Sequence, residues 1–349
     1  MPDKKKRIEV LDGLRGLAIL LVFLFHGYYI WDAYYPFGKL YAGNLLFKYG
    51  SLGVQLFFLI SGFVILMSVE KTPGFRIFIK NRWLRLFPGM LTCSLIIYFT
   101  AGFFYERPFG IPELKSLLPG ITFINNSILE RIFSTDFPVL ELSFWSLYVE
   151  VKFYVIFGAL YFIFNRNTAL AGIFILYVSA ALLQILIVHQ LLAENAAMKI
   201  YIGSFIHFGW FVAGALTYIY YRDHDKRYLY LLIISLVCSV FYAYKFHDPV
   251  LYIYLISVIL VFLGALFWAP FGVLFESRFF RLVGFISYPL YLLHENMLIA
   301  SMIKLHRHIP QIPYLLLPAL SFIFIGILAY TVARFLEPAF QRLLKKIIN

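Results

Sequence analysis

Residues 11–26 read LDGLRGLAILLVFLFH. The stretch has most of the length and apolar character of a membrane-spanning helix, which needs roughly 20 mostly apolar residues. It nevertheless contains Arg15 and ends at His26, and ionisable residues are costly inside a bilayer. Eleven residues of helix correspond to about three turns and a rise of about 16 Å, so Arg15 and His26 share one face at different depths.

The rest of the chain is equally apolar. Of its 349 residues, 62% are hydrophobic and 14% are charged, whereas a soluble domain is roughly half apolar and a quarter charged. We therefore expect an all-α polytopic integral membrane protein with about ten transmembrane helices. The expected helices are 13–34, 50–69, 89–105, 145–164, 169–192, 200–221, 229–246, 250–270, 283–304 and 312–335.

Basic residues are unevenly distributed between the two sides that ten helices would define. About two thirds of the 30 Lys and Arg residues fall on the side of the N-terminus, and such an excess marks cytoplasmic loops. We expect both termini in the cytoplasm and one membrane domain over 1–349. Its expected parts are a cytoplasmic N-terminus (1–10), a basic cytoplasmic segment (70–88), an outside segment (106–144) and a cytoplasmic tail (337–349). The net charge of +12 then reflects orientation in a lipid bilayer, and no nucleic acid partner is expected.

Two segments carry small or basic residues at helical spacing. GSLGVQLFFLISGFVI (50–65) contains Gly50, Gly53 and Gly62, which permit close approach of helices. Its Ser61 is expected to pack, since no base beside it is visible that would make it a nucleophile. In NRWLRLFP (81–88), two arginines, Arg82 and Arg85, share a helical face. They either hold an interfacial helix to anionic lipid or bind phosphate groups, and the same two interpretations apply to Arg15.

Two further segments place ionisable groups within the membrane. In FWSLYVEVKFY (144–154), Trp145 suits the outer interface, and Glu150 lies about 7 Å deeper. Lys152 points away from Glu150, so the carboxylate needs a cation on another helix or a wet cavity. GFISYPLYLLHENML (284–298) places His294 and Glu295 at similar depth, which favours one shared polar cavity. The tight ligand spacings of a metal site are absent, and no metal is expected.

Together these motifs resemble those of the membrane acyltransferase 3 family. LDGLRGLAILLVFLFH is similar to the opening motif of the family, in which ten residues separate an arginine from a histidine. GSLGVQLFFLISGF resembles the motif of its second helix, and NRWLRLFP resembles its Arg-x-x-Arg motif. FWSLYVEVKFY and ISYPLYLLH are similar to its Trp-Ser-Leu-x-x-Glu and Tyr-Leu-x-His segments. Five motifs in the family's order cover essentially the whole chain. Val151 and Lys152 depart from the acid and glutamine of many members, and Gln55 from their aspartate, which puts a second carboxylate in question but not Glu150.

The resemblance implies a multi-pass enzyme of the bacterial cytoplasmic (inner) membrane, in the form without an appended esterase-like domain. It implies transfer of an acyl group, most often acetyl, from cytosolic acyl-CoA. The implied acceptor is a hydroxyl of a cell-surface or lipid-linked glycan, of O-antigen or exopolysaccharide type. Acyl-CoA is then a donor substrate, with no tightly bound cofactor. The oligomeric state stays open.

The residues and the resemblance together suggest roles for each site residue. We expect His26 and Glu150 to be catalytic, with His26 as general base or as carrier of a covalent acyl group. Either Glu150 or Asp12 orients or charge-balances a basic group. Three arginines are expected to bind the phosphates of acyl-CoA: Arg15, Arg82 and Arg85. The expected supporting or acceptor-cavity residues are Asp12, Ser61, Trp145, Tyr291 and His294.

A transporter or flippase of a lipid-linked glycan or small solute is the alternative function. Ten helices with buried polar groups also suit that class of protein. The two functions differ in one observation, because only the transferase is expected to gain thermal stability from acyl-CoA. A purely structural membrane protein would leave the buried ionisable groups unexplained.

Overall fold

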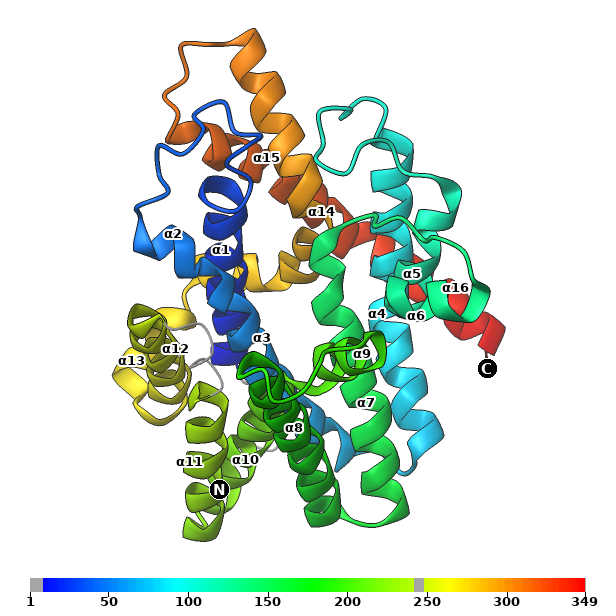
Figure 1. Ribbon diagram of the computed structural model, residues 1–349, viewed down its shortest axis with the longest axis vertical. Helices are drawn as coiled ribbons and strands as arrows, with labels where there is room; N and C mark the ends of the chain where they lie inside the picture. Colours follow the sequence, from blue (N-terminus) through cyan, green and yellow to red (C-terminus); the bar gives the residue numbers. More distant parts are fainter. Residues whose placement is uncertain (1–8, 242–247, 349) are drawn as a thin grey trace. The chain divides into compact units, whose positions relative to one another are not determined.

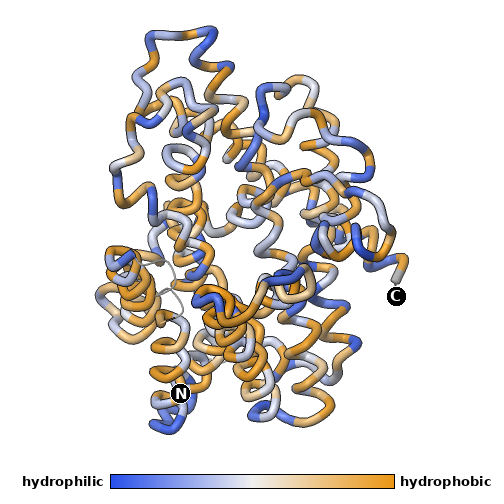
Figure 2. The backbone as a smooth tube through the Cα atoms, viewed as in Figure 1, coloured by the Kyte–Doolittle hydropathy of each residue, from blue (hydrophilic) through white to orange (hydrophobic). Residues whose placement is uncertain are grey.

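The computed structural model describes residues 9–241 and 248–348, and all regular elements in these ranges are helices (Figure 1). Residues 1–8 of the predicted cytoplasmic N-terminus and the end of the predicted helix 229–246 lie outside the described residues. Hydrophobic residues dominate the helices, and hydrophilic residues gather in their connections (Figure 2). This distribution is expected of helices that satisfy their own backbone hydrogen bonds in lipid.

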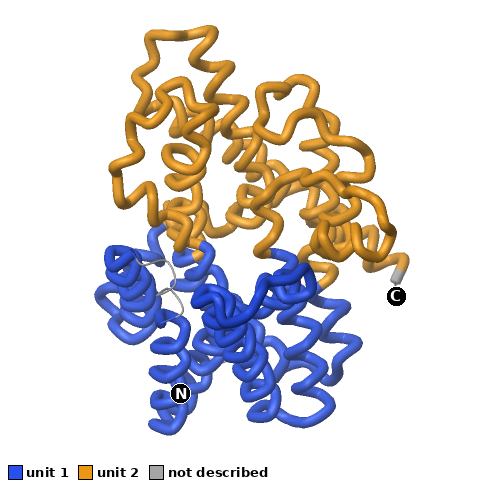
Figure 3. The backbone as a smooth tube through the Cα atoms, viewed as in Figure 1, with its two compact units in different colours: residues 1–14, 54–82, 147–277 blue, residues 15–53, 83–146, 278–349 orange. Residues whose placement is uncertain are grey.

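The chain divides into two compact units (Figure 3). Unit 1 contains residues 1–14, 54–82 and 147–277, and unit 2 contains residues 15–53, 83–146 and 278–349. Four helices contribute residues to both units: α1 (Glu9–Tyr28), α3 (Gly53–Val69, of which only Gly53 belongs to unit 2), α4 (Phe75–Thr100) and α7 (Trp145–Ile163).

Unit 1 is organised around α10 (Phe208–Asp223), which is buried over most of its length and packs against α8 and α11. A Cβ atom added to Gly62 or Gly214 would lie 2.0 Å from the carbonyl oxygen of Phe211 or Leu59, respectively. The backbones of α3 and α10 are therefore in direct contact, as predicted for Gly62. The other helices of this unit are α3 (Gly53–Val69), α8 (Arg166–Val188), α9 (Ala196–Phe205), α11 (Lys226–Phe241), α12 (Pro249–Phe267) and α13 (Ala269–Phe275).

Unit 2 is organised around α14 (Arg278–His308), whose middle is buried and which packs against α15 (Leu316–Thr331). α1 contacts the chain that enters α3, because a Cβ atom on Gly50 or Gly53 would lie 2.3 Å from a carbonyl oxygen of α1. These contacts confirm the predicted packing role of the two glycines. The remaining helices are α2 (Leu45–Tyr49), α5 (Leu117–Thr122), α6 (Asn126–Phe133) and α16 (Glu337–Ile348), which a π-helical turn, Val332–Leu336, joins to α15.

Among the described residues, eight helical stretches are long and apolar enough to cross a membrane. They confirm eight of the ten predicted spans and a polytopic membrane protein. The other two predicted spans also form helices, but α11 has only 16 residues in the described range and α14 carries too many polar residues. Their crossing of the membrane stays a prediction. The eight stretches are Glu9–Tyr28, Leu45–Val69, Phe75–Thr100, Leu142–Ile163, Arg166–Val188, Ala196–Asp223, Pro249–Phe267 and Leu316–Ile347.

The boundary predicted between the basic segment 70–88 and a helix at 89–105 is wrong. α4 is continuous from Phe75 to Thr100, with Pro88 inside it. Membrane helices tolerate an internal proline because other groups satisfy the backbone hydrogen bond that it removes. Arg82 and Arg85 therefore lie on the first half of one long helix. The predicted outside segment 106–144 holds only short helices and irregular connections.

Candidate active site

His26 lies near the end of α1, and each of its ring nitrogens faces a defined group of unit 2. Nδ1 lies 2.9 Å from the carbonyl oxygen of Val22, one turn earlier. A carbonyl oxygen only accepts hydrogen bonds, so Nδ1 carries the proton of the neutral ring. Nε2 lies 3.7 Å from Oε1 of Glu295. The neutral ring therefore presents a basic lone pair beside a carboxylate.

A second histidine, His294 on α14, lies against His26. The two rings meet edge to face with centroids 4.6 Å apart. Nδ1 of His294 lies 2.8 Å from the carbonyl oxygen of Tyr291, which assigns the proton to this nitrogen as well. Its Nε2 is buried and has no hydrogen-bond partner among the described residues. The structure thus brings together the two histidines that the sequence placed at similar depth.

Glu295, the residue after His294, is held in place by the short helical turn Leu142–Phe144 just before α7. Its Oε2 accepts a hydrogen bond of 2.7 Å from the backbone N–H of Ser143. The neighbouring Tyr291 donates a 2.9 Å hydrogen bond to the carbonyl oxygen of Ser143, and its hydroxyl lies 2.8 Å from that of Ser146. Trp145, predicted at the outer interface, is half-buried in the same turn of the chain. Because these bonds fix the carboxylate, it faces His26 with little freedom to move.

A buried ion pair lies within the predicted outside segment, and Asn296 of α14 is hydrogen-bonded to its carboxylate. Arg107 lies 3.3 Å from Oε1 of Glu141 and donates a 2.6 Å hydrogen bond to the carbonyl oxygen of Leu140. Asn296 donates to Oε2 of Glu141 from its side chain at 2.7 Å and from its backbone at 3.1 Å. Burial raises the pKa of the Glu141 carboxyl and lowers that of the Arg107 guanidinium, and each charge opposes the shift of the other.

Glu150 lies in unit 1, on α7, and its partners differ from those predicted. The sequence favoured a cation or a wet cavity, but the carboxylate accepts hydrogen bonds from the hydroxyls of Ser61 and Tyr154. Ser61, for which the sequence favoured helix packing over a nucleophilic role and which was also expected as a supporting or acceptor-cavity residue, thus lies beside a carboxylate. Two neutral donors can satisfy a carboxylate without a cation. The catalytic role predicted for Glu150 stays a prediction.

The residues expected to bind acyl-CoA lie in both units. Arg15 shares the continuous helix α1 with His26, which confirms their common face and separation of about 16 Å. Arg85 belongs to unit 2 and is exposed. Arg82 and Asp12 belong to unit 1, where Arg82 is half-buried and Asp12 is buried. The binding of acyl-CoA by the three arginines, and the role of Asp12, stay predictions.

Four residues of this site were missed as site residues by the sequence prediction: Arg107, Glu141, Glu295 and Asn296. The pairing of Glu141 with Arg107 and Asn296 joins positions more than 30 residues apart, and no local pattern indicates it. Glu295 was recognisable, because a carboxylate directly follows a histidine in a mostly apolar segment. Within residues 9–241 and 248–348, no three His, Cys, Asp or Glu side chains cluster as a metal ion would require.

Comparison with known proteins adds independent information on this chain. The family model described as an acyltransferase domain matches residues 8–336. Peptidoglycan O-acetyltransferase OatA of Listeria monocytogenes is 26% identical over 181 residues, which cover 46% of this chain and 25% of OatA. The O-acetyl transferase of Shigella phage Sf6 is 25% identical over 179 residues, 49% of this chain and 51% of that protein.

A third relative is acyltransferase MdmB of Streptomyces mycarofaciens, 28% identical over 169 residues that cover 46% of this chain and 41% of MdmB. The alignments thus span between a quarter and about half of the length of these relatives. No solved structure matches the chain significantly.

Proposed function

This chain belongs to the membrane acyltransferase 3 family, and on that basis we propose that it is an O-acetyltransferase that uses acetyl-CoA from the cytosol. The proposed acceptor is a hydroxyl group of a cell-surface or lipid-linked glycan, of O-antigen or exopolysaccharide type, and the proposed location is the bacterial cytoplasmic membrane. The names of the relatives support O-acetyl transfer, and the eight apolar helices support a membrane enzyme.

The observation that carries the proposal is the orientation of His26. Its Nδ1–H donates to the carbonyl oxygen of Val22, which leaves Nε2 as the basic atom, 3.7 Å from Glu295. A general base needs an available lone pair, and a neighbouring negative charge stabilises the imidazolium that forms. The His26 side chain is 14% exposed and Glu295 is 1% exposed, so water screens this interaction weakly.

The reaction follows from this arrangement. Nε2 of His26 accepts the proton of the acceptor hydroxyl while the hydroxyl oxygen attacks the carbonyl carbon of the thioester. The new C–O bond forms, the C–S bond breaks, and the proton passes from the imidazolium to the departing sulfur of CoA. Arg15, about 16 Å away along α1, then interacts with the phosphates of the donor, as do Arg82 and Arg85.

Replacement of His26 tests the proposal. We expect His26→Ala to lower the rate of acetyl transfer by about a thousandfold, in the range typical of a lost general base. The measurement is CoA release and acceptor acetylation by the purified protein, with His308→Ala, an exposed residue at the end of α14, as control. Full activity of a correctly inserted His26→Ala protein would rule out this role.

Two further measurements identify the donor and the acceptor. Acetyl-CoA is expected to raise the thermal unfolding temperature of the purified protein by preferential binding to the folded state. A protein that only moves glycans across the membrane would show no such shift. Mass spectrometry of surface glycans from cells with and without the gene identifies the acetylated hydroxyl, and identical glycans would contradict the proposed acceptor class.

A further inference from the structure

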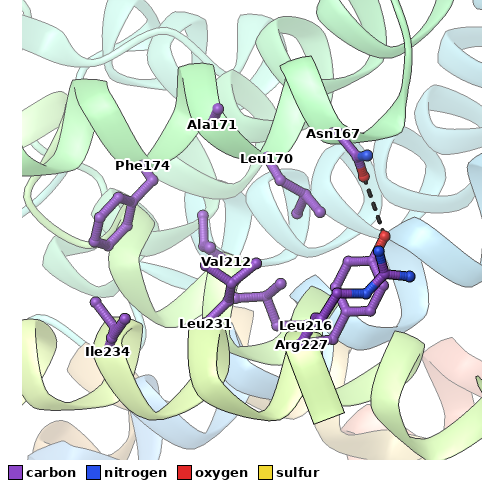
Figure 4. Close-up of a pocket in the computed structure, with 10 residues that line it drawn as sticks. Asn167, Leu170, Ala171, Phe174, Val212, Leu216, Arg227, Leu231 and Ile234 are labelled. Carbon is purple, nitrogen blue, oxygen red and sulfur yellow. Dashed lines mark hydrogen bonds between the residues drawn. The ribbon is translucent and has the colours of Figure 1, made fainter. Parts of the chain in front are cut away.

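Unit 1 contains a pocket of about 430 Å³ between α8, α10 and α11 that the proposed reaction does not use. Figure 4 shows its polar residues, Asn167 and Arg227, at one end and Phe174 with Ile234 at the other. Seven of its ten lining residues are aliphatic or Phe, and its volume lies within the range of small-molecule sites. The apolar lining consists of Leu170, Ala171, Phe174, Val212, Leu216, Leu231 and Ile234.

The helices that form this pocket are covered by lipid over much of their surface. Only 17% of the apolar stretch of α8 is buried inside the protein, so the bilayer is left to cover the rest. Leu231 and Ile234 on α11 are about half exposed at the edge of the pocket. From Asn167 to Phe174 the pocket extends about 10 Å along α8. A flexible hydrocarbon chain that already surrounds the helices can enter a pocket of this shape and polarity.

The polar end of the pocket offers hydrogen-bond donors to an anion. Tyr228 donates to Asn167 at 3.3 Å and accepts a 2.8 Å hydrogen bond from Arg166. The guanidinium of Arg227 is 86% exposed, and within the described residues its ion-pair partner is the surface carboxylate of Asp225. Exposed ion pairs of this kind contribute little, so a phosphate can replace Asp225 as the acceptor. The charge distribution predicts that this end lies in the cytoplasm, where the membrane surface is negative.

We infer that this pocket binds one acyl chain of an anionic phospholipid, with the chain along the apolar wall and the phosphate group at Arg227. The ligand is a membrane lipid and differs in place and chemistry from the acyl donor and the glycan acceptor. The inference rests on the pocket of unit 1 and is independent of the proposed transferase reaction.

The acyl-chain contact is tested by filling the pocket. Ile234→Trp places an indole in the pocket, whereas Ile233→Trp changes a neighbouring residue of similar exposure that does not line it. Native mass spectrometry of the full-length protein with added phosphatidylglycerol measures the bound lipid. We expect Ile234→Trp to weaken binding by about tenfold or more, since each buried methylene changes affinity about fourfold. Equal binding by the two variants would overturn the inference.

The headgroup contact is tested by removing one positive charge. In wild type we expect phosphatidylglycerol to bind more tightly than phosphatidylcholine with the same chains. Arg227→Gln should abolish this preference, and Lys226→Gln, which removes an exposed charge outside the pocket, should preserve it. A preference that persists in Arg227→Gln, or that is absent from wild type, would overturn the anionic assignment. Thermal unfolding of each variant checks that it is folded.

Discussion

At the scale of single residues, the proposed site depends on Glu295, which lies 3.7 Å from the proposed base, His26, and is itself held by the backbone of Ser143. Its carboxylate stabilises His26 electrostatically only when His26 takes up a proton, because it then faces a positive charge in a buried setting. The sequence predicted both histidines of the site, since ionisable groups inside apolar segments are conspicuous. It did not predict that Ser143 would hold the carboxylate, because residues 152 positions apart meet only through the fold.

We predict that Glu295→Gln lowers kcat by about a hundredfold, a loss typical of a removed electrostatic partner. The KM for acetyl-CoA should change little, because the amide keeps the shape and the hydrogen bond with Ser143. Steady-state kinetics of the purified variant measure both quantities, and Glu295→Asp should recover part of kcat. If the amount of folded protein falls instead, and the folded fraction keeps the wild-type kcat, Glu295 contributes only to stability.

Glu106, also in unit 2, allows a prediction on pH. Its carboxylate lies 3.2 Å from Lys304 and 3.0 Å from Arg307. Burial alone would raise the pKa of Glu106, but hydrogen bonds from its own backbone and from Lys304 hold it below its ordinary value of 4.5. A lowered pKa in the folded state stabilises the protein above pH 4.5, and this contribution disappears as the pH falls through the lowered value.

Glu106→Gln should therefore lower the thermal stability at pH 7, by about 0.5–1 kcal/mol. The difference from wild type should shrink as the pH is lowered below 4.5. Thermal unfolding in detergent between pH 7 and pH 3.5 measures this, with the more exposed Glu113→Gln as control. A difference that is the same at both pH values would contradict the assigned contribution.

At the scale of helices, the position of α1 is set by direct contact with glycines. The Cβ atom of any other residue at Gly53 would lie 2.3 Å from the carbonyl oxygen of Ala18. We predict that Gly53→Ala destabilises the protein by about 1–3 kcal/mol and lowers activity, because α1 carries His26. Thermal unfolding and transfer assays measure these effects. Gly43→Ala, where no atom lies within 4 Å, should change neither, and equal stability of the two variants would refute the contact.

The presence of a helix was easier to predict than the residues at which it begins and ends. Long apolar runs gave eight spans correctly, since membrane helices need about 20 apolar residues. The start of α4 was predicted wrongly at 89, because the spans were chosen as mostly apolar runs and the preceding stretch is rich in basic residues. The polar composition of α14 is possible because His294, Glu295 and Asn296 are covered by protein instead of lipid. The hydrogen-bond partners of Glu150, Ser61 and Tyr154, were missed because a positive charge was expected, and hydroxyl groups are neutral.

At the scale of the whole chain, the distribution of basic residues predicts the side of the membrane on which each connection lies. Gly43 belongs to a connection predicted outside, and Gly74 to one predicted in the cytoplasm. No atom lies within 4 Å of a side chain added at either glycine. Both positions therefore accept a cysteine without disturbing their surroundings.

We predict that a membrane-impermeant maleimide labels Gly43→Cys in intact cells and labels Gly74→Cys only after the membrane is opened. The parent protein gives the background, because Cys93 is buried and Cys238 lies on an apolar helix. Labelling of Gly74→Cys in intact cells, with Gly43→Cys protected, would reverse the orientation and place the arginines of α4 outside the cytosol.

The succession His294, Glu295 and Asn296 has a consequence for inhibition. Consecutive residues of a helix point about 100° apart, and these three contact different segments: His26, Ser143 and Glu141. An antibody fragment that binds segment 106–144 and breaks the contact between Glu141 and Asn296 would disturb the residue next to Glu295, whose carboxylate faces His26. If the predicted outside location of segment 106–144 holds, a ligand bound to that segment can act on this helix turn without entering the bilayer and without competing with the proposed donor.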